Sequence, residues 1–589
     1  ISSSDEAPTS REPFNQLDDW IHQQLARSHM GLSPISLYLA ALDWIMHLGI
    51  SPGRQFELGV KRIEQMQQWK NQVMDLYSNG QLPPSAGHLD DRFADKGWEY
   101  GPFSLWRERF LADAEWWREA SRVDGMSRHH QQLVEFYARQ WMDALSPANV
   151  PFLNPQVQQR ALETQGESLR DGWIKLWADT FKALWSPPDV LDVLTHQVGQ
   201  DVAATPGEVV YRNHLFELIQ YHPTTASVVA EPLLIVPSTI MKYYILDLST
   251  HNSMIQYLVN QGFTVLVMSW RNPDATDRDL GMDDYLIEGV MQAMHQTAAL
   301  TRSRRIHTMG YCLGGTFLAI VASLLGSTYQ RKGSWPNPMP ELASTTLLAA
   351  QTDFSEPGEL GLFIDEDQLK TLREEMARTG YLSGKQMAGT FQFLNSRDMI
   401  WSKHIQRHFL GKDEVGSDMM SWNADTTRLP ERMHNEYLRQ LFLDNALRNG
   451  TYKVRGHAVS VENMTAPLMV IGTEKDHVAP WRSVFKILLD SQVDSHFILA
   501  SGGHNAGVIS EPGHPHRHYR TGVQTAQQAW VSPDEWLQDA VVQSGSWWPA
   551  WSEWLQAQSS QDTHKPRRIA RSKSLGPAPG DYVMVRYSD

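Results

Sequence analysis

The chain has 589 residues, of which 41% are hydrophobic and 20% are charged, and a formal net charge of −15. This composition is ordinary for a globular protein, and the negative charge argues against general nucleic-acid binding. A single cysteine excludes an intrachain disulfide framework, suits a reducing cytosol and leaves no Cys pair for a zinc site. No apolar run reaches the roughly eighteen residues of a membrane span, so we expect no transmembrane segment.

Residues 1–82 are predicted to form a helical N-terminal extension. Ser33-Pro34 and Ser51-Pro52 each place an N-cap residue before a proline suited to the first helical position, which predicts helices over 34–49 and 52–79. A further helix is predicted earlier, from apolar residues at helical spacing. These are Phe14, Leu17, Trp20, Ile21 and Leu25.

A proline-rich linker over 82–87 precedes a second helical, aromatic-rich domain, which we place at residues 83–200. From residue 201 to 589, short apolar strands alternate with helices. This alternation predicts an α/β domain built on a parallel sheet that is covered on both faces. The predicted strands are 208–212, 232–237, 263–270, 306–309, 344–350, 467–472 and 495–500, and the clearest helices between them are 253–260 and 284–299.

Two segments depart from the alternation. Residues 355–465 are long, polar and aromatic and lie between two predicted strands, so we expect a cap or lid over the carboxyl ends of the strands. Near the C-terminal end, residues 582–586 alternate in polarity, and this pattern predicts one last strand.

The strand 306–309 leads into Gly310-Tyr311-Cys312-Leu313-Gly314, and a helix is predicted directly afterwards. This is the context of a nucleophile elbow, the G-x-S-x-G turn of hydrolases, with Cys in place of Ser. Side chains at the two glycines would clash with the neighbouring strand and helix. The helix N-terminus behind Cys312 favours a thiolate and a later oxyanion. A buried structural thiol beside two chance glycines is the alternative interpretation.

A cysteine nucleophile needs a base, and the base needs an orienting acid. Asp476 follows the strand 467–472, and His504 follows the strand 495–500, so the chain order is nucleophile, acid, base, as in α/β-hydrolases. Glu474 is the rival acid. His477, next to the acid, is predicted to be a supporting donor or part of the acyl path.

The oxyanion hole is expected to use the backbone N–H of Leu313 and one from the loop after the strand 232–237, where Thr239 and Ile240 are the candidates. We predict no metal site and no cofactor. A histidine cluster lies further along, but its proline and the lack of a distant partner favour a solvated loop. It comprises His514, His516 and His518.

From about residue 10 onward the chain resembles the polyhydroxyalkanoate synthases, polyester polymerases that use (R)-3-hydroxyacyl-CoA. The strongest match is Gly310 to Gly315, since the family box is Gly-x-Cys-x-Gly-Gly. The leader, with Gly31-Leu-Ser-Pro34, resembles the N-terminal extension of single-subunit class I members. Further matches are Ser146-Pro-Ala-Asn149, Gln220-Tyr221, Tyr243 to Leu248, Ser269 to Pro273, Trp422-Asn423, Asp476-His477, Gly503-His504, Gly545 to Pro549 and Ala578 to Gly580.

The resemblance implies an α/β-hydrolase fold with a lid and a mostly helical N-terminal domain. It implies that Cys312 carries the acyl chain, His504 is the base and Asp476 orients it. It also implies release of coenzyme A, a growing polyester chain, a homodimer and a cytoplasmic location on polymer granules. Two positions depart from the family pattern and leave substrate range and activity open: Met241, where Asn is expected, and Asn505, where Ile is usual.

Three functions remain open from the sequence. The first is a polymerising acyltransferase, the second a thioesterase or intracellular polyester depolymerase of the same fold, and the third a noncatalytic granule-binding protein. With one cysteine per chain, a growing polymer cannot pass between two thiols of one chain. Either two chains pair their Cys312 residues, or one thiol works with a noncovalent intermediate.

Overall fold

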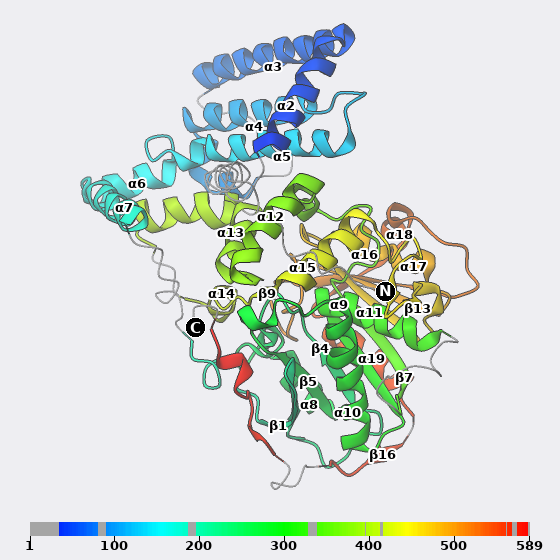
Figure 1. The fold of residues 1–589 in the computed structure, drawn as a ribbon. Coiled ribbons are helices and arrows are strands. Elements are labelled where there is room, and N and C mark those ends of the chain that lie inside the picture. The colour runs from blue at the N-terminus through cyan, green and yellow to red at the C-terminus, as the bar shows by residue number, and fades with distance from the viewer. Residues whose placement is uncertain are drawn as a thin grey trace. The chain divides into compact units, whose positions relative to one another are not determined.

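A computed structural model divides the chain into two compact units (Figure 1). One unit comprises Ile1–Leu191 and Gly389–Val415, and the other comprises Asp192–Ala388 and Gly416–Asp589. The predicted insertion at 355–465 is thus divided between them. The described residues are 34–79, 90–185, 196–327, 338–394, 396–412, 416–560, 562–567 and 574–586, so the predicted helix at 14–25 and the linker at 82–87 lie outside them.

The described elements of the first unit are helices joined by turns and short irregular segments. The predicted helices near the N-terminus are confirmed as α2 (Pro34–Gly49) and α3 (Pro52–Asn79). α2 packs on α5, and α3 packs on α4. The remaining helices are α4 (Phe103–Ala120), α5 (Arg128–Ala144), α6 (Pro155–Glu163) and α7 (Glu167–Trp185), with two π-helical segments at Arg397–Ser402 and Ile405–Phe409.

Many apolar side chains of α2 and α3 are exposed, among them Ile45 (55%) and Met46 (60%). Within the described ranges, no one helix has both the length and the apolar character to cross a membrane. The pair Ile35–Gly49 and Pro52–Ser78, bent by 91°, meets the length and composition test only when its two helices are counted together.

The second unit is built on one eleven-stranded sheet, in the order β15-β14-β13-β12-β7-β6-β4-β5-β2-β1-β17. The six strands from β13 to β5 are parallel, as predicted, and the strands at both edges are antiparallel. Its strands are β1 (Gly207–Arg212), β2 (Phe216–Tyr221), β4 (Leu233–Val236), β5 (Val265–Trp270), β6 (Arg305–Tyr311), β7 (Glu341–Leu348), β12 (Leu468–Thr473), β13 (Ser495–Ala500), β14 (His518–Gln524), β15 (Val541–Ser544) and β17 (Gly576–Pro577).

The predicted parallel sheet therefore forms the centre of the observed sheet, and the antiparallel edges were not predicted. β14 and β15 are half-buried or exposed, so they lack the continuous apolar run that marks a central strand. β2 is fully buried but follows β1 after three residues, and only β1 was predicted from the sequence.

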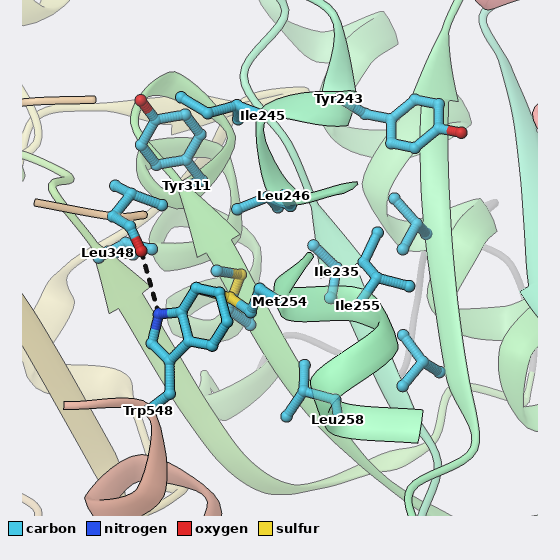
Figure 2. Close-up of a cluster of buried hydrophobic side chains, with 14 of the residues drawn as sticks. Ile235, Tyr243, Ile245, Leu246, Met254, Ile255, Leu258, Tyr311, Leu348 and Trp548 are labelled. Atoms are coloured by element: carbon cyan, nitrogen blue, oxygen red, sulfur yellow. Dashed lines mark hydrogen bonds between the residues drawn. The ribbon is translucent and has the colours of Figure 1, made fainter. Parts of the chain in front are cut away.

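Helices cover both faces of the sheet. Met309 and Tyr311 of β6 belong to a buried cluster shared with α8 (Met254–Asn260) and α19 (Trp548–Gln558), part of which Figure 2 shows. Gly310 lies between them in the strand and contacts α11 (Leu313–Gly326) on the other face, because successive residues of a strand point to opposite sides. α10 (Gln292–Thr301) packs on β4 and β6, continuing a π-helical segment at Tyr285–Met291.

The inserted residues of this unit are mainly helical: α12 (Glu366–Thr379), the start of α13 (Gly384–Leu394), α14 (Asp418–Ala424) and α15 (Glu431–Tyr437). Smaller elements complete the unit. They are β3 (Val228–Val229), β8 (Tyr381–Leu382), β9 (Leu429–Pro430), β10 (Lys453–Val454), β11 (His457–Ala458), β16 (Thr563–His564), α9 (Met282–Asp284), α16 (Trp481–Phe485), α17 (Ile487–Asp490) and α18 (Pro533–Asp539).

The strand predicted at 582–586 is wrong, since Tyr582–Met584 form a 3-10 turn. The backbone there bonds to buried charged side chains instead of to a neighbouring strand. The carboxylate of Glu217 accepts the N–H groups of Asp581 and Tyr582, both at 3.0 Å. The ammonium of Lys242 donates to the carbonyl of Val583 at 2.9 Å. These contacts tie the tail to β2 and to the loop after β4.

Candidate active site

Cys312 lies in the turn between β6 and α11, where the sequence predicted a nucleophile elbow. Its φ is 53° and its ψ is −126°, a conformation that a non-glycine residue rarely adopts. The Cys312 N–H donates to the carbonyl of Leu348 at 2.9 Å, and its own carbonyl accepts the N–H of Gly315 and Thr316. Hydrogen bonds to both sides of the residue therefore hold this strained turn in place.

The glycines around the cysteine are required by close backbone contacts. A Cβ on Gly314 would lie 2.3 Å from the carbonyl oxygen of Pro237, and one on Gly310 would lie 2.4 Å from the Cα of Gly315. Contacts this short leave no room for a side chain. They also place the first turn of α11 directly against the end of β4, where the predicted oxyanion loop begins.

The structure brings the three predicted catalytic side chains together. The Nδ1 of His504 lies 2.7 Å from Oδ2 of Asp476, and the charge of Cys312 acts on the same imidazole. Asp476 is held in turn by the hydroxyl of Thr473 and by the N–H groups of Val478 and Ala479, at 2.8–3.0 Å. The carboxylate is thereby fixed before it orients the histidine.

Burial alone would lower the pKa of the His504 imidazole. The negative charges of Asp476 and Cys312 and the hydrogen bonds to both outweigh it, so the pKa of His504 lies well above its ordinary value. A protonated imidazole next to sulfur stabilises a thiolate, the form of cysteine that acts as a nucleophile.

The rival acid and the supporting histidine lie elsewhere. Glu474 faces His518, with 3.3 Å between Oε1 and Nε2. The ring of His477 is 58% exposed, and its Nδ1 lies 3.9 Å from Oε1 of Glu359. In the described part of the chain, no hydrogen bond joins the His477 ring to Asp476 or His504.

The loop after β4 carries the oxyanion candidates. Leu313 is the first residue of α11, so its N–H has no intrahelical acceptor. The N–H of Ile240 donates to the hydroxyl of Ser238 at 3.2 Å. Thr427 holds this loop from the side, since its hydroxyl and its N–H donate to the carbonyls of Thr239 and Ile240. Of the two loop candidates, the N–H of Ile240 is thus already engaged.

Three residues near the thiol were assigned no role in the site from the sequence. The ring of Tyr311 lies beside His504, with 5.6 Å between centroids. Asn505 accepts the hydroxyl proton of Tyr311. Tyr437 of α15 is half-buried, and desolvation of its hydroxyl, followed by the charge of Cys312, raises its pKa. Adjacency to Cys312 and His504 was the available signal for the first two, and nothing in the sequence marks Tyr437.

Among the described residues, no group of three His, Cys, Asp or Glu side chains is arranged to hold a metal ion. Within the histidine cluster, His514 faces the carbonyl of Pro515 and His518 faces Glu474.

The fold is that of an α/β-hydrolase, and the elbow places a cysteine at the nucleophile position. A family model for this fold matches residues 232–506. Models described as the poly-beta-hydroxybutyrate polymerase N-terminus and N-terminal region match residues 89–258 and 12–54. The predicted fold class is therefore confirmed.

Curated relatives cover most of the chain. The poly(3-hydroxyalkanoate) polymerase of Methylorubrum extorquens is 38% identical over 86% of this chain and 82% of its own. The poly(3-hydroxyalkanoate) polymerase subunit PhaC of Cupriavidus necator is 34% identical over 85% and 84%. A solved monoacylglycerol lipase from Paleococcus ferrophilus is similar at 12% identity and a TM-score of 0.29, covering 57% of this chain and 98% of its own. The chain belongs to the poly(3-hydroxyalkanoate) polymerase family and is an acyltransferase-type polymerase enzyme, which confirms the resemblance inferred from the sequence.

Proposed function

We propose that this chain polymerises (R)-3-hydroxyacyl-CoA into a polyester with release of coenzyme A, through an acyl thioester on Cys312. The observation that carries the proposal is the hydrogen bond from His504 to Asp476, with the charge of Cys312 at the elbow acting on the same imidazole. The names of the relatives support the same reaction class.

The first half-reaction loads the acyl group. The thiolate of Cys312 attacks the thioester carbonyl, and the N–H of Leu313, with that of Thr239, donates to the developing oxyanion. The sulfur of coenzyme A leaves and takes the proton of the His504 imidazolium. The acyl group is then bound to Cys312 as a thioester, and His504 is neutral.

The second half-reaction extends the chain. Neutral His504 removes the proton from the 3-hydroxyl of one acyl unit as this oxygen attacks the thioester carbonyl of another. An ester bond forms, the carbon–sulfur bond breaks, and a thiolate and imidazolium are regenerated. The thioester keeps the acyl group activated, because thiol–thioester exchange is nearly balanced. Exclusion of water would favour the hydroxyl over hydrolysis.

The test is to measure coenzyme A release from (R)-3-hydroxybutyryl-CoA together with the product, for the wild type and for Cys312→Ala. We expect sedimentable polymer from the wild type and none from the variant. Free acid in equal amount to coenzyme A would contradict polymerisation and indicate the thioesterase of the same fold. Release that persists in the variant would contradict the thiol mechanism.

We further propose that the chain works as a homodimer at the surface of polymer granules in the cytoplasm, without a metal or cofactor. The exposed apolar side chains of α2 support attachment to an apolar surface. Ile45→Ser with Met46→Ser is expected to reduce co-sedimentation with polymer granules while coenzyme A release stays within about twofold. Val541→Ser, also at an exposed apolar residue (60%), is the matched control and should leave co-sedimentation unchanged.

The dimer is one of two ways for a chain with a single cysteine to extend a polymer, because passage of the polymer between two thiols requires two copies. Single-turnover trapping of acyl groups, combined with the mass of the species in solution, tests it. Full activity from a strictly monomeric preparation would exclude paired thiols and favour one thiol with a noncovalent intermediate.

A further inference from the structure

Tyr311 places a polar group at the edge of the apolar core. The residue is only 2% exposed, and its ring packs in the cluster that α8 and α19 share with the sheet. Figure 2 shows the hydroxyl at the end of the ring that faces away from Met254 and Trp548. A buried hydroxyl needs a hydrogen-bond partner, because leaving it unpaired costs the free energy of its lost hydration.

Asn505 supplies that partner. The hydroxyl of Tyr311 donates to Oδ1 of Asn505 at 2.9 Å. The backbone of Asn505 is itself fixed, since its carbonyl accepts the N–H groups of Val508 and Ile509. Burial, and then the charges of Cys312 and Asp476, raise the pKa of Tyr311 well above its ordinary value, so the hydroxyl stays protonated and remains a donor.

The pair touches the proposed base from two directions. Asn505 is the next residue after His504 in the chain. The ring of Tyr311 lies beside the imidazole, with 5.6 Å between the centroids and 32° between the planes. The charged and titratable groups that act on His504 are Asp476 and Cys312, the two that also act on Tyr311.

The hydrogen bond from Tyr311 to Asn505 also sets the orientation of the Asn505 amide. Because Oδ1 accepts from Tyr311, the NH₂ group faces the other way, where Nδ2 lies 3.5 Å from Oδ1 of Asn423 on α14. Asn423 is well anchored, because the indole of the adjacent Trp422 donates to the carbonyl of Lys242 at 2.8 Å. One continuous set of side chains thus runs from the cysteine turn to the inserted helix.

We propose that Tyr311 and Asn505 act as a positioning pair, which holds the His504 imidazole in line between Asp476 and Cys312 and connects it to α14 through Asn423. The proposal rests on the proposed role of His504 as the base. Neither residue of the pair takes part in bond making. Each acts through the orientation of the histidine.

A double-variant cycle tests the pair. Asn505→Leu, which is close in shape, leaves the Tyr311 hydroxyl without an acceptor, and Tyr311→Phe leaves the Asn505 oxygen without a donor. We expect each single change to lower kcat about tenfold, since one buried polar group is left unpaired. The combined change replaces the bond by an apolar contact and should return kcat to within about threefold of the wild type.

The informative readout is the pH dependence of Cys312 alkylation by iodoacetamide, which needs no acyl-CoA. Each single variant is expected to shift this profile, and the combined variant to restore it. If both single variants keep the wild-type alkylation profile and kcat, the positioning role is wrong. It is also wrong if the loss of kcat in the combined variant equals the product of the two single losses. A wild type that alkylates normally but releases no coenzyme A would contradict the proposed function instead.

Tyr257→Phe is the matched control. Its hydroxyl also forms a hydrogen bond in this core, at 3.1 Å to Ser552, without being in contact with His504. It should leave the alkylation profile unchanged, and a shift there would mean that general loosening of the core explains the result. If Asn505→Leu does not fold, Tyr311→Phe alone decides the question, because it removes a single oxygen atom.

Discussion

Two apolar helices of similar length, α11 with 14 residues and α2 with 16, differ completely in their surroundings. Every residue of α11 from Leu313 to Leu324 is buried in the sheet unit. From residue 35 to 49 of α2, only Ala40 is buried. Apolar composition therefore does not decide which helix forms a core. What distinguishes α11 is the pair of glycines that lets it approach the sheet, and the same approach forms the nucleophile turn.

The largest expected effect is at Gly314. Gly314→Ala forces a methyl group onto the carbonyl oxygens of Pro237 and Val236, at 2.3 and 2.4 Å, so we expect loss of both folded protein and acyl transfer. Gly59→Ala in α3 is the control, because nothing lies within 4 Å of its added Cβ. It should stabilise by up to about 1 kcal/mol. Soluble yield and urea unfolding of the two variants measure the contrast, and a folded, active Gly314→Ala would contradict it.

The next effect is on catalysis alone. Asp476→Asn removes the charge that orients His504, and we expect acyl transfer to fall by roughly a hundredfold to ten-thousandfold. The pKa of His504 should fall as well, because the Asp476 charge is one of the causes that raise it. The inflection of the pH–rate profile that belongs to the imidazole should therefore move to lower pH. Glu474→Gln is the control, since Glu474 faces His518, and an equal loss there would reassign the acid.

Two tryptophans, one buried and one exposed, extend the comparison of the two helices to protein stability. Trp551 of α19 is 0% exposed and donates to the hydroxyl of Thr346, whereas Trp177 of α7 is 62% exposed. We expect Trp551→Ala to lower the free energy of unfolding by about 3–5 kcal/mol, and Trp177→Ala to change it by no more than about 0.5 kcal/mol. If urea unfolding showed that both variants lose a comparable free energy of unfolding, the exposed face of α7 would be covered in solution.

A smaller effect depends on pH. Burial lowers the pKa of His307 and of His434 to about 4, and both lie in the sheet unit. In the unfolded chain each takes up a proton near pH 6.5, so the stability they contribute is complete above that pH and is lost as the pH falls toward 4. We expect protonation of each histidine to lower the free energy of unfolding by roughly 2–4 kcal/mol over this pH range. Urea unfolding at intervals between pH 7 and pH 4 measures it, and a flat curve would show that water reaches both rings in the folded state.

The sequence predicted the centre of the fold well and its edges poorly. Most of the parallel strands contain a short apolar stretch, such as Leu233–Val236 in β4, so β4, β5, β6, β7, β12 and β13 were located to within a few residues. The antiparallel strand β14 has half-buried residues and no such pattern. The tail at Tyr582 alternates like a strand, yet its backbone bonds to Glu217, a pairing across 365 positions that no local pattern shows.

The candidate active site was also predicted from the sequence only in part. Cys312, Asp476 and His504 each follow a predicted strand in a fixed chain order, so their residue types and order were enough to select them. Asn505 could not be assigned a role, because its partner Tyr311 lies 194 positions away and is defined by one hydrogen bond. Thr427 was missed for the same reason, since it supports the oxyanion loop from another segment of the chain.

The attachment of Lys242 to Val583, 341 positions later, has a consequence for the order of events during synthesis. The strand, the turn and the helix that present Cys312 are all translated before Val583. Until that residue emerges, the loop beside the thiol lacks a carbonyl that binds its buried lysine. A nascent chain therefore carries its nucleophile before the contact between the tail and this loop can form.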